Sequence, residues 1–122
     1  MIKKIIIPSK LISDYIRFAT IEGESKLSGD HKTGNAMVKK LNKIVELIKD
    51  DTSHTQTVFL AIMQSDSFRA RSLAAVDALK LNILIDEAVS VLEESLKRTD
   101  ILGFGSEMAL KLWRGEVSGK TL

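Results

Sequence analysis

The chain has 122 residues, of which 44% are hydrophobic and 28% charged, and 18 Lys and Arg oppose 16 Asp and Glu for a formal net charge of +2. This composition predicts one soluble globular domain, and so small a net charge is not that of a strongly basic nucleic-acid-binding protein. The absence of cysteine excludes disulfides, thiolate catalysis and cysteine-ligated zinc, and it is compatible with the reducing cytoplasm that we expect.

The two ends of the chain carry no helical pattern. Pro8 interrupts an apolar run, Ile5 to Ile7, that is too short for the core of a signal peptide. No apolar stretch approaches the roughly 18 residues that a membrane span needs, so no membrane partner is expected. We predict a single domain over 1–122, with a flexible lead-in at 1–8 and a flexible tail at 116–122.

Six segments between these ends have apolar residues at helical spacing. They predict helices at about 9–26, within 33–51, at about 54–64, within 66–81, at about 84–97 and within 100–116. The third contains the continuous apolar run VFLAIM, which resembles a strand, but a capping box formed by Ser53 and Gln56 favours a helix. Gly115 is expected to end the sixth helix.

The fourth predicted helix has an apolar side and a polar side, and Ser65 or Asp66 is its expected N-cap. At 100° per residue, the inward side consists of Phe68, Ser72, Ala75, Val76 and Leu79. Arg69, Asp77 and Lys80 fall on the opposite side. Arg71 lies at the edge of a flank of alanines, where its guanidinium must find an acceptor because an unpaired buried charge is costly.

The fourth and fifth segments, DSFRARSLAAVDAL and IDEAVSVLEESL, resemble a HEAT or armadillo repeat. Together with GDHKTGNAMVKKL and LGFGSEMALKLWRGE, they resemble a family of small, uncharacterised bacterial proteins with an α-α superhelix fold. The resemblance implies an all-α chain of about six helices, arranged in antiparallel hairpins and wound into a HEAT- or armadillo-like right-handed α-α superhelix. It concerns the fold far more than any activity.

The same resemblance implies structural roles for individual residues. Asp30 and Asn35 would fix the start of the second helix. Arg71 would take the place of the repeat arginine that pairs with an acidic side chain of an adjacent repeat, with Asp66 and Asp100 as candidate partners. The sequence departs from the repeat pattern by having no proline after the repeat aspartate, and by having Asp77 where a small apolar residue is common.

Two glycines flank a phenylalanine at the start of the sixth helix. We expect Phe104 to fill the groove between the fifth and sixth helices, because Gly103 and Gly105 permit a tight turn and a close backbone approach. Trp113 would then close the open end of the stack of hairpins, as a terminal repeat must.

No catalytic or metal-binding motif is apparent. His31 and His54 are the only histidines, and neither has a second ligand four residues away on a helix. The stretch SGDHKTGN has glycines but not the spacing of a phosphate-binding loop, and no Ser, His and Asp set has a recognisable frame. We therefore predict a protein that is not an enzyme and holds neither a metal nor a cofactor.

The second, fourth and sixth helices would line the concave side of such a superhelix. A mixed-charge binding surface is predicted there, composed of Lys39, Lys43, Arg69, Leu73, Asp77 and Lys80. An apolar centre with a charged rim is typical of partner sites, and Leu73 would be that centre. The sequence therefore favours a non-enzymatic module that binds another protein, such as an immunity- or antitoxin-like protein.

Two other classes of function stay open. A nucleic-acid-binding protein would use a continuous basic groove from Lys39 and Lys43 to Arg69 and Lys80, and its binding would weaken steeply with salt. A small hydrolase would need a pocket with convergent polar residues and perturbed ionisation.

Overall fold

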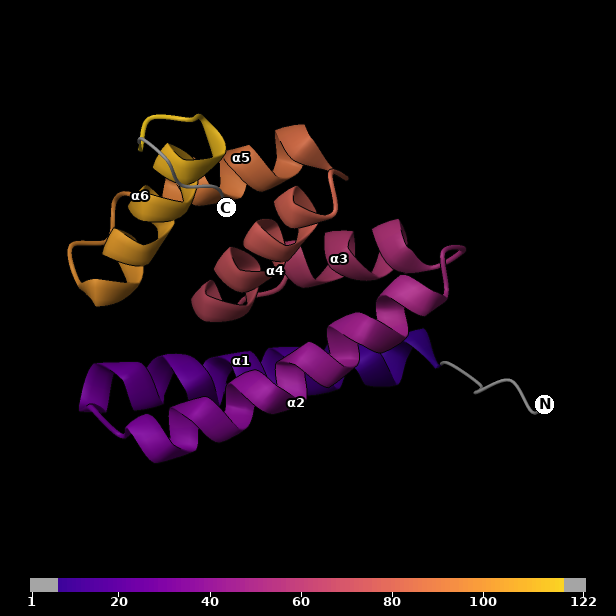
Figure 1. The fold of residues 1–122 in the computed structure, drawn as a ribbon. Coiled ribbons are helices and arrows are strands. Elements are labelled where there is room, and N and C mark those ends of the chain that lie inside the picture. Colours follow the sequence, from indigo (N-terminus) through magenta and orange to yellow (C-terminus); the bar gives the residue numbers. More distant parts are fainter. Residues whose placement is uncertain (1–6, 118–122) are drawn as a thin grey trace.

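The structure, a computed structural model, describes residues 7–117, so most of the predicted flexible lead-in and tail lies outside the described residues. Within 7–117 the chain forms six α-helices and no strand, which confirms the all-α prediction (Figure 1). The helices are α1 (Pro8–Ser28), α2 (His31–Asp50), α3 (Thr55–Met63), α4 (Phe68–Lys80), α5 (Ile85–Ser95) and α6 (Ile101–Trp113). None of them is long and apolar enough to cross a membrane.

The first two helices form a long antiparallel hairpin (Figure 1). Its turn contains Gly29, whose φ of 78° is the left-handed conformation that glycine adopts without strain. Asp30 caps α2 by accepting a hydrogen bond from the backbone N–H of Thr33 at 3.2 Å, as expected. Asn35 is exposed within α2 and takes no part in the cap, so the role implied for it is wrong.

Helix α4 lies in the middle of the molecule, where it contacts α1, α3, α5 and α6. Four alanines allow these close approaches, and all are fully buried: Ala70, Ala74, Ala75 and Ala78. Neighbouring helices therefore cover α4 on more than one side. The prediction that α4 has one solvated polar face is wrong, because that interpretation assumed a helix with a single buried side.

One hydrophobic core extends through all six helices. Its largest fully buried side chains are Tyr15, Ile48, Val58, Phe59, Ile62, Leu79, Leu92 and Leu110. Trp113, the last residue of α6, packs against this core and is partly buried. Gly115 follows with a φ of 72° and ends the helix, as predicted.

The N-caps of two helices differ from prediction. No capping box forms at α3, because the Ser53 hydroxyl donates to the carboxylate of Asp51 at 2.6 Å. Thr55 instead joins α3 to α2 by donating to the backbone carbonyl of Ile48 at 2.9 Å. Helix α4 is capped by Ser67, whose hydroxyl accepts from the N–H of Ala70, and not by Ser65 or Asp66.

Candidate functional site

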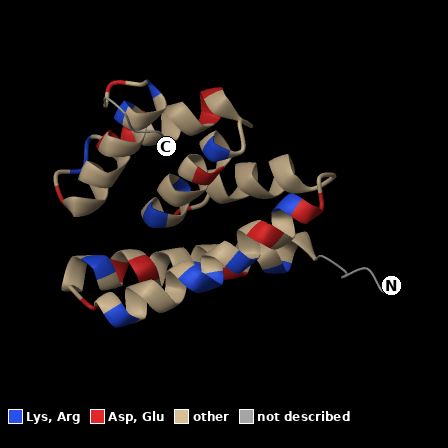
Figure 2. Cartoon of the chain, viewed as in Figure 1, with Lys and Arg blue, Asp and Glu red and all other residues tan. Residues whose placement is uncertain are grey.

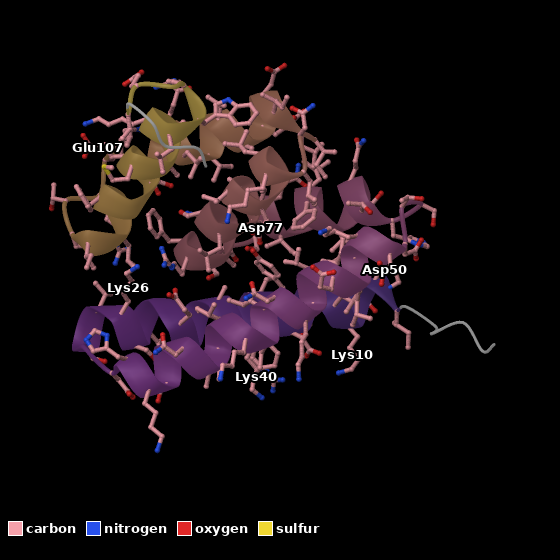
Figure 3. The ribbon with its side chains drawn as sticks, viewed as in Figure 1. Lys10, Lys26, Lys40, Asp50, Asp77 and Glu107 are labelled. Atoms are coloured by element: carbon pink, nitrogen blue, oxygen red, sulfur yellow. The ribbon has the colours of Figure 1, made fainter. Side chains whose placement is uncertain are left out.

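Two of the predicted partner-binding residues are engaged inside the fold. Arg69 of α4 donates to Glu22 of α1, with Nε 2.6 Å from Oε1 and Nη2 3.2 Å from Oε2. Asp77 accepts a 2.7 Å hydrogen bond from the hydroxyl of Tyr15, and it lies on the side of α4 that faces α1 (Figure 3). The prediction that Arg69 and Asp77 point into solvent is therefore wrong.

This α1–α4 contact perturbs the ionisation of its members. Desolvation by burial raises the pKa of the Asp77 carboxyl, although the hydrogen bond from Tyr15 opposes that effect. Burial, followed by the nearby charge of Asp77, raises the pKa of Tyr15 well above its ordinary value. The two groups serve each other as donor and acceptor between packed helices, and neither is presented to a ligand.

The remaining residues of the predicted surface differ in their exposure. Lys39, Lys43 and Lys80 are exposed, whereas Leu73 is partly buried against the core. Lys and Arg residues lie on α1, α2, α4 and α6 and in the loop after α5, so they are not gathered on one surface (Figure 2). Because Arg69 is paired with Glu22, it supplies no link in a basic groove that would join α2 to Lys80. The six residues therefore do not form one surface.

Phe104 does not fill a groove between α5 and α6. Its side chain is 58% exposed, and two other large apolar side chains are exposed near it, Ile101 at 49% and Leu96 at 44%. Ile101 and Phe104 are three residues apart on α6 and therefore share a face of the helix. Leu96 and Phe104 line the same hollow of about 340 Å³. We call Leu96, Ile101 and Phe104 the α6 edge.

The two glycines beside Phe104 have different roles. A Cβ on Gly103 would lie 2.0 Å from the backbone oxygen of Arg98, so this position requires glycine, as predicted. A Cβ on Gly105 would meet no atom within 4 Å, so the prediction of a close approach there is wrong.

Asp100 organises the start of α6. Its carboxylate accepts from the backbone N–H groups of Leu102 and Gly103, and also from Nε of Arg98 at 2.7 Å. Desolvation opposes ionisation of this group, but the hydrogen bonds from Arg98 and Gly103 outweigh it and lower the pKa of Asp100. Asp100 therefore both pairs with Arg98 and caps α6.

Arg71 pairs with neither Asp66 nor Asp100, so the expected salt bridge is wrong. Its Nη1 donates to the backbone carbonyl of Ser65 at 2.9 Å. No salt bridge within residues 7–117 includes Arg71. Its guanidinium carbon lies 6.0 Å from the centre of the Phe68 ring. Arg71 is therefore a partly buried cation that has no carboxylate partner among the described residues.

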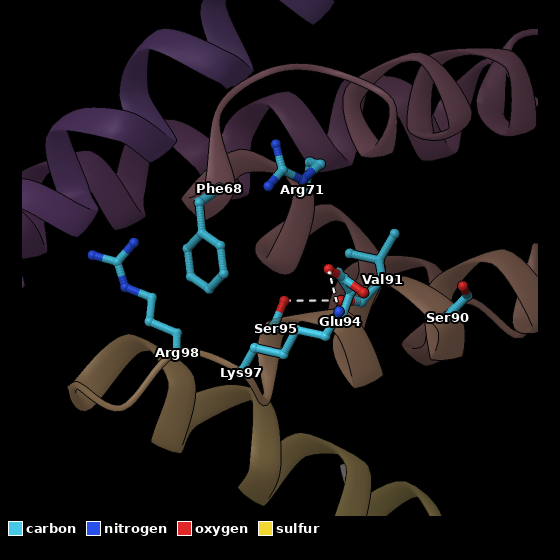
Figure 4. A pocket seen from close by; sticks show the side chains of 8 residues that line it. All are labelled: Phe68, Arg71, Ser90, Val91, Glu94, Ser95, Lys97 and Arg98. Atoms are coloured by element: carbon cyan, nitrogen blue, oxygen red, sulfur yellow. Dashed lines mark hydrogen bonds and ion pairs between the residues drawn. The ribbon is translucent and has the colours of Figure 1, made fainter.

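A pocket of about 500 Å³ lies between α4 and α5 beside these groups (Figure 4). It is lined by Phe68, Arg71, Ser90, Val91, Glu94, Ser95, Lys97 and Arg98. The guanidinium carbon of Arg98 lies 4.6 Å from the Phe68 ring centre, so the ring lies between the two arginines. We call this the Phe68 pocket, and its polar lining is the strongest candidate for ligand recognition in the described part of the chain.

Neither residue at the centre of this pocket is among the predicted site residues. The helical periodicity predicts Phe68 in the core, but it is only partly buried. Arg98 belongs to no predicted site, although an arginine two residues before a capping aspartate is in reach of that carboxylate. That spacing is the one signal that could have identified it.

A turn before α3 holds serine, histidine and aspartate side chains together. His54 Nδ1 lies 2.7 Å from Asp51 Oδ2 and 3.1 Å from the Ser53 hydroxyl. In a catalytic triad the serine and the carboxylate bind opposite nitrogens of the imidazole, whereas here both face Nδ1. The hydrogen bonds from Ser53 and then from His54 lower the pKa of Asp51. This cluster stabilises the turn and has no geometry for proton relay.

No group of three His, Asp or Glu side chains between residues 7 and 117 is arranged to hold a metal ion. Comparisons of the chain with known protein families, with curated proteins and with solved structures found no match.

Proposed function

We propose that this chain is a non-enzymatic module that binds another protein, and that the α6 edge is its docking surface. The observation that carries the proposal is the exposure of Phe104 and Leu96 beside one hollow, with Ile101 exposed on the same face of α6 as Phe104. Grouped apolar side chains are costly to leave in water and commonly mark interaction sites. Aromatic residues in particular supply binding hot spots.

The surroundings of the α6 edge support a protein partner. The hollow beside Phe104 is also lined by Arg98, Asp100 and Glu107, so charged groups surround an apolar centre. That arrangement is typical of non-obligate protein interfaces. Gly103 and the Asp100 cap hold the start of α6 in one conformation, which lowers the entropy lost when a partner binds.

We also propose that the three antiparallel helix pairs are degenerate HEAT-like repeats of a short superhelix. Support comes from the pairing of α1 with α2, α3 with α4 and α5 with α6, and from the packing of each pair on the next through α4. The α6 edge belongs to the last of these pairs. The absence of cysteine supports a reducing cytoplasm as the place of action.

The test replaces Phe104 with the photo-crosslinking residue p-benzoylphenylalanine in cells that express the chain naturally. The protein captured there is identified, purified and titrated against the wild type and Phe104→Ser. Ile85→Ser is the matched control, because Ile85 is also a large apolar residue that is exposed, but it lies at the start of α5. We expect at least a tenfold loss of affinity for Phe104→Ser and none for Ile85→Ser.

Equal affinity of Phe104→Ser and the wild type would contradict the proposal. So would crosslinking of the chain only to a second copy of itself. Because Phe104 is exposed, the substitution is expected to leave the folded state intact, which circular dichroism of the variant checks.

A second candidate, nucleic-acid binding, rests on a different face. Arg17 and Lys40 lie 4.8 and 5.1 Å from the ring centre of Phe18, on the α1–α2 hairpin, and Lys39 and Lys43 are exposed nearby in sequence. Cations beside an aromatic ring are typical of single-strand binding surfaces. This proposal requires a binding constant that falls steeply with salt, and Lys40→Gln with Lys43→Gln must reduce that slope.

A further inference from the structure

We propose that the Phe68 pocket binds a carboxylate from an acidic segment of the partner protein, held by the guanidinium group of Arg71, while Arg98 adds positive charge from the other side of the Phe68 ring. This inference rests on the proposed function, because it names the chemistry of the partner that docks on the neighbouring α6 edge.

The charge balance of the pocket favours an anion. Its lining contains three cations, Arg71, Lys97 and Arg98, and one carboxylate, Glu94. Glu94 is paired with Lys97 at 3.0 Å. Asp100, outside this lining, neutralises Arg98, which leaves the positive charge of Arg71 without a carboxylate among the described residues. A partly buried guanidinium in that state gains most from an anionic ligand.

The ends of the flanking helices do not decide the sign of the potential here. Phe68 is the first residue of α4, whose positive dipole end therefore lies at the pocket. Ser95 is the last residue of α5, whose negative dipole end lies at the same place. The two contributions oppose each other, so the side chains set the preference for an anion.

Both guanidinium groups are held in place before any ligand binds. Arg71 donates from Nη1 to the Ser65 carbonyl, and Arg98 donates from Nε to Asp100. Within residues 7–117 the other N–H groups of these two side chains have no hydrogen-bond acceptor. The Phe68 ring lies beside both groups and gives the pocket an apolar floor (Figure 4). Fixed donors of this kind suit the planar, two-oxygen geometry of a carboxylate.

The pocket continues into the proposed docking surface through Arg98. This residue lines the Phe68 pocket and also the hollow beside Leu96 and Phe104. A single extended segment with an acidic residue next to an apolar one therefore reaches both sites. The occupant we infer is an acidic, apolar peptide segment and not a free inorganic anion.

The test is an NMR titration of the ¹⁵N-labelled full chain with two matched peptides. One is acetyl-Gly-Leu-Asp-Glu-Leu-Gly-amide, and the other carries Asn and Gln in place of Asp and Glu. We expect the acidic peptide to shift the amide signals of 68–72 and 94–98, and the neutral peptide to cause no saturable shift there. Inorganic phosphate at the same concentration serves as the third probe.

The variants separate recognition from general attraction between charges. Arg71→Gln is expected to weaken binding of the acidic peptide at least tenfold, and Arg71→Lys to weaken it by less because the charge remains. Arg17→Gln is the matched control, since Arg17 also lies beside an aromatic ring, at 4.8 Å, but on α1. It must bind the peptide like the wild type. Well-dispersed spectra of each variant show that it is folded.

Three results would overturn the inference: equal binding of the acidic and neutral peptides, unchanged binding by both Arg71 variants, or phosphate alone saturating the same signals at equal concentration. Failure of the proposed function looks different. In that case the peptide titrates the pocket as expected, but crosslinking from position 104 captures no other protein. If the crosslinked partner binds and Arg71→Gln has no effect on its affinity, the inference alone is wrong.

Discussion

Arg69 and Glu22 form a two-pronged ion pair that ties α4 to α1, with both side chains only about a tenth exposed, at 11% and 10%. Gly23 makes room for it, because a Cβ at that position would lie 2.8 Å from Cγ of Arg69. The pair therefore depends on a glycine next to one of its partners. It also engages Arg69, which is predicted from the sequence to belong to a binding surface.

Breaking this ion pair on one side should be more damaging than removing it entirely. Arg69→Met leaves the Glu22 carboxylate buried without a partner, and we expect a loss of about 3–5 kcal/mol in the free energy of unfolding. The double variant Glu22→Leu with Arg69→Met removes both charges and should recover most of that loss. Urea unfolding of the two single variants and the double variant measures the coupling. Additive losses would show that the pair has no energetic role.

The two glycines beside Phe104 should respond in opposite ways to alanine. Gly103→Ala pushes a methyl group into the backbone oxygen of Arg98, at 2.0 Å, so the start of α6 must shift and the protein is strongly destabilised. Gly105→Ala is within a helix and meets open space, so stability should rise by up to about 1 kcal/mol. Thermal unfolding of the two variants compares these effects. Similar melting temperatures would contradict the assignment.

The contributions of Asp77 and Asp100 to the free energy of unfolding should depend on pH in opposite directions. The pKa of Asp77 is raised above its ordinary value of 3.8, so the folded state binds more protons than the unfolded state just above that pH. The stability that Asp77 contributes is therefore present below pH 3.8 and is lost as the pH rises through the higher, folded-state pKa. Asp77→Asn removes this loss and should gain stability relative to the wild type over that window.

Asp100 supplies the opposite control for that experiment. Its pKa is lowered, so its contribution is present above pH 3.8 and is lost as the pH falls through the folded-state value. Asp100→Asn should therefore be less stable than the wild type near neutral pH and approach it in acid. Unfolding free energies measured from pH 2 to pH 7 test both variants. Parallel curves for Asp77→Asn and the wild type would refute the buried-carboxyl assignment.

The cap of α4 can be identified by three substitutions of similar size. Ser67 accepts the hydrogen bond from the Ala70 N–H at 3.2 Å, so Ser67→Ala should cost about 1 kcal/mol. The Ser65 hydroxyl is buried without a hydrogen-bond partner among the described residues, so Ser65→Ala should be neutral or stabilising. Asp66→Ala, an exposed position, should have little effect. Chemical denaturation ranks the three losses of stability, and a larger loss at Ser65 or Asp66 than at Ser67 would contradict Ser67 as the cap.

The sequence predicted the number, order and approximate limits of the helices because apolar periodicity is a local property. It failed at α4 for a physical reason. Arg69 and Asp77 are polar, but their partners Glu22 and Tyr15 lie 47 and 62 residues earlier in the chain. Periodicity within α4 does not reveal a polar partner that packing brings from another helix, so it predicts both residues on a solvent-facing side.

At the candidate site, the sequence correctly predicted that Gly103 permits a close approach. It wrongly predicted that the side chain of Phe104 is buried. Phe104 shares its face of α6 with Ile101, and that face is exposed. The buried side of α6 is marked instead by Leu102, Ser106, Ala109 and Leu110. Two apolar rows along one helix are equivalent in the sequence, and only the position of α5 distinguishes them.

The alanine-lined position of α4 also bears on how this sequence can evolve. A helix enclosed by four neighbours, with Ala70, Ala74, Ala75 and Ala78 at zero exposure, has no space for larger side chains. Helix α2, which packs mainly on α1, leaves most of its surface free to vary. Relatives that diverge far in α2 should therefore still be recognisable by the small residues of α4.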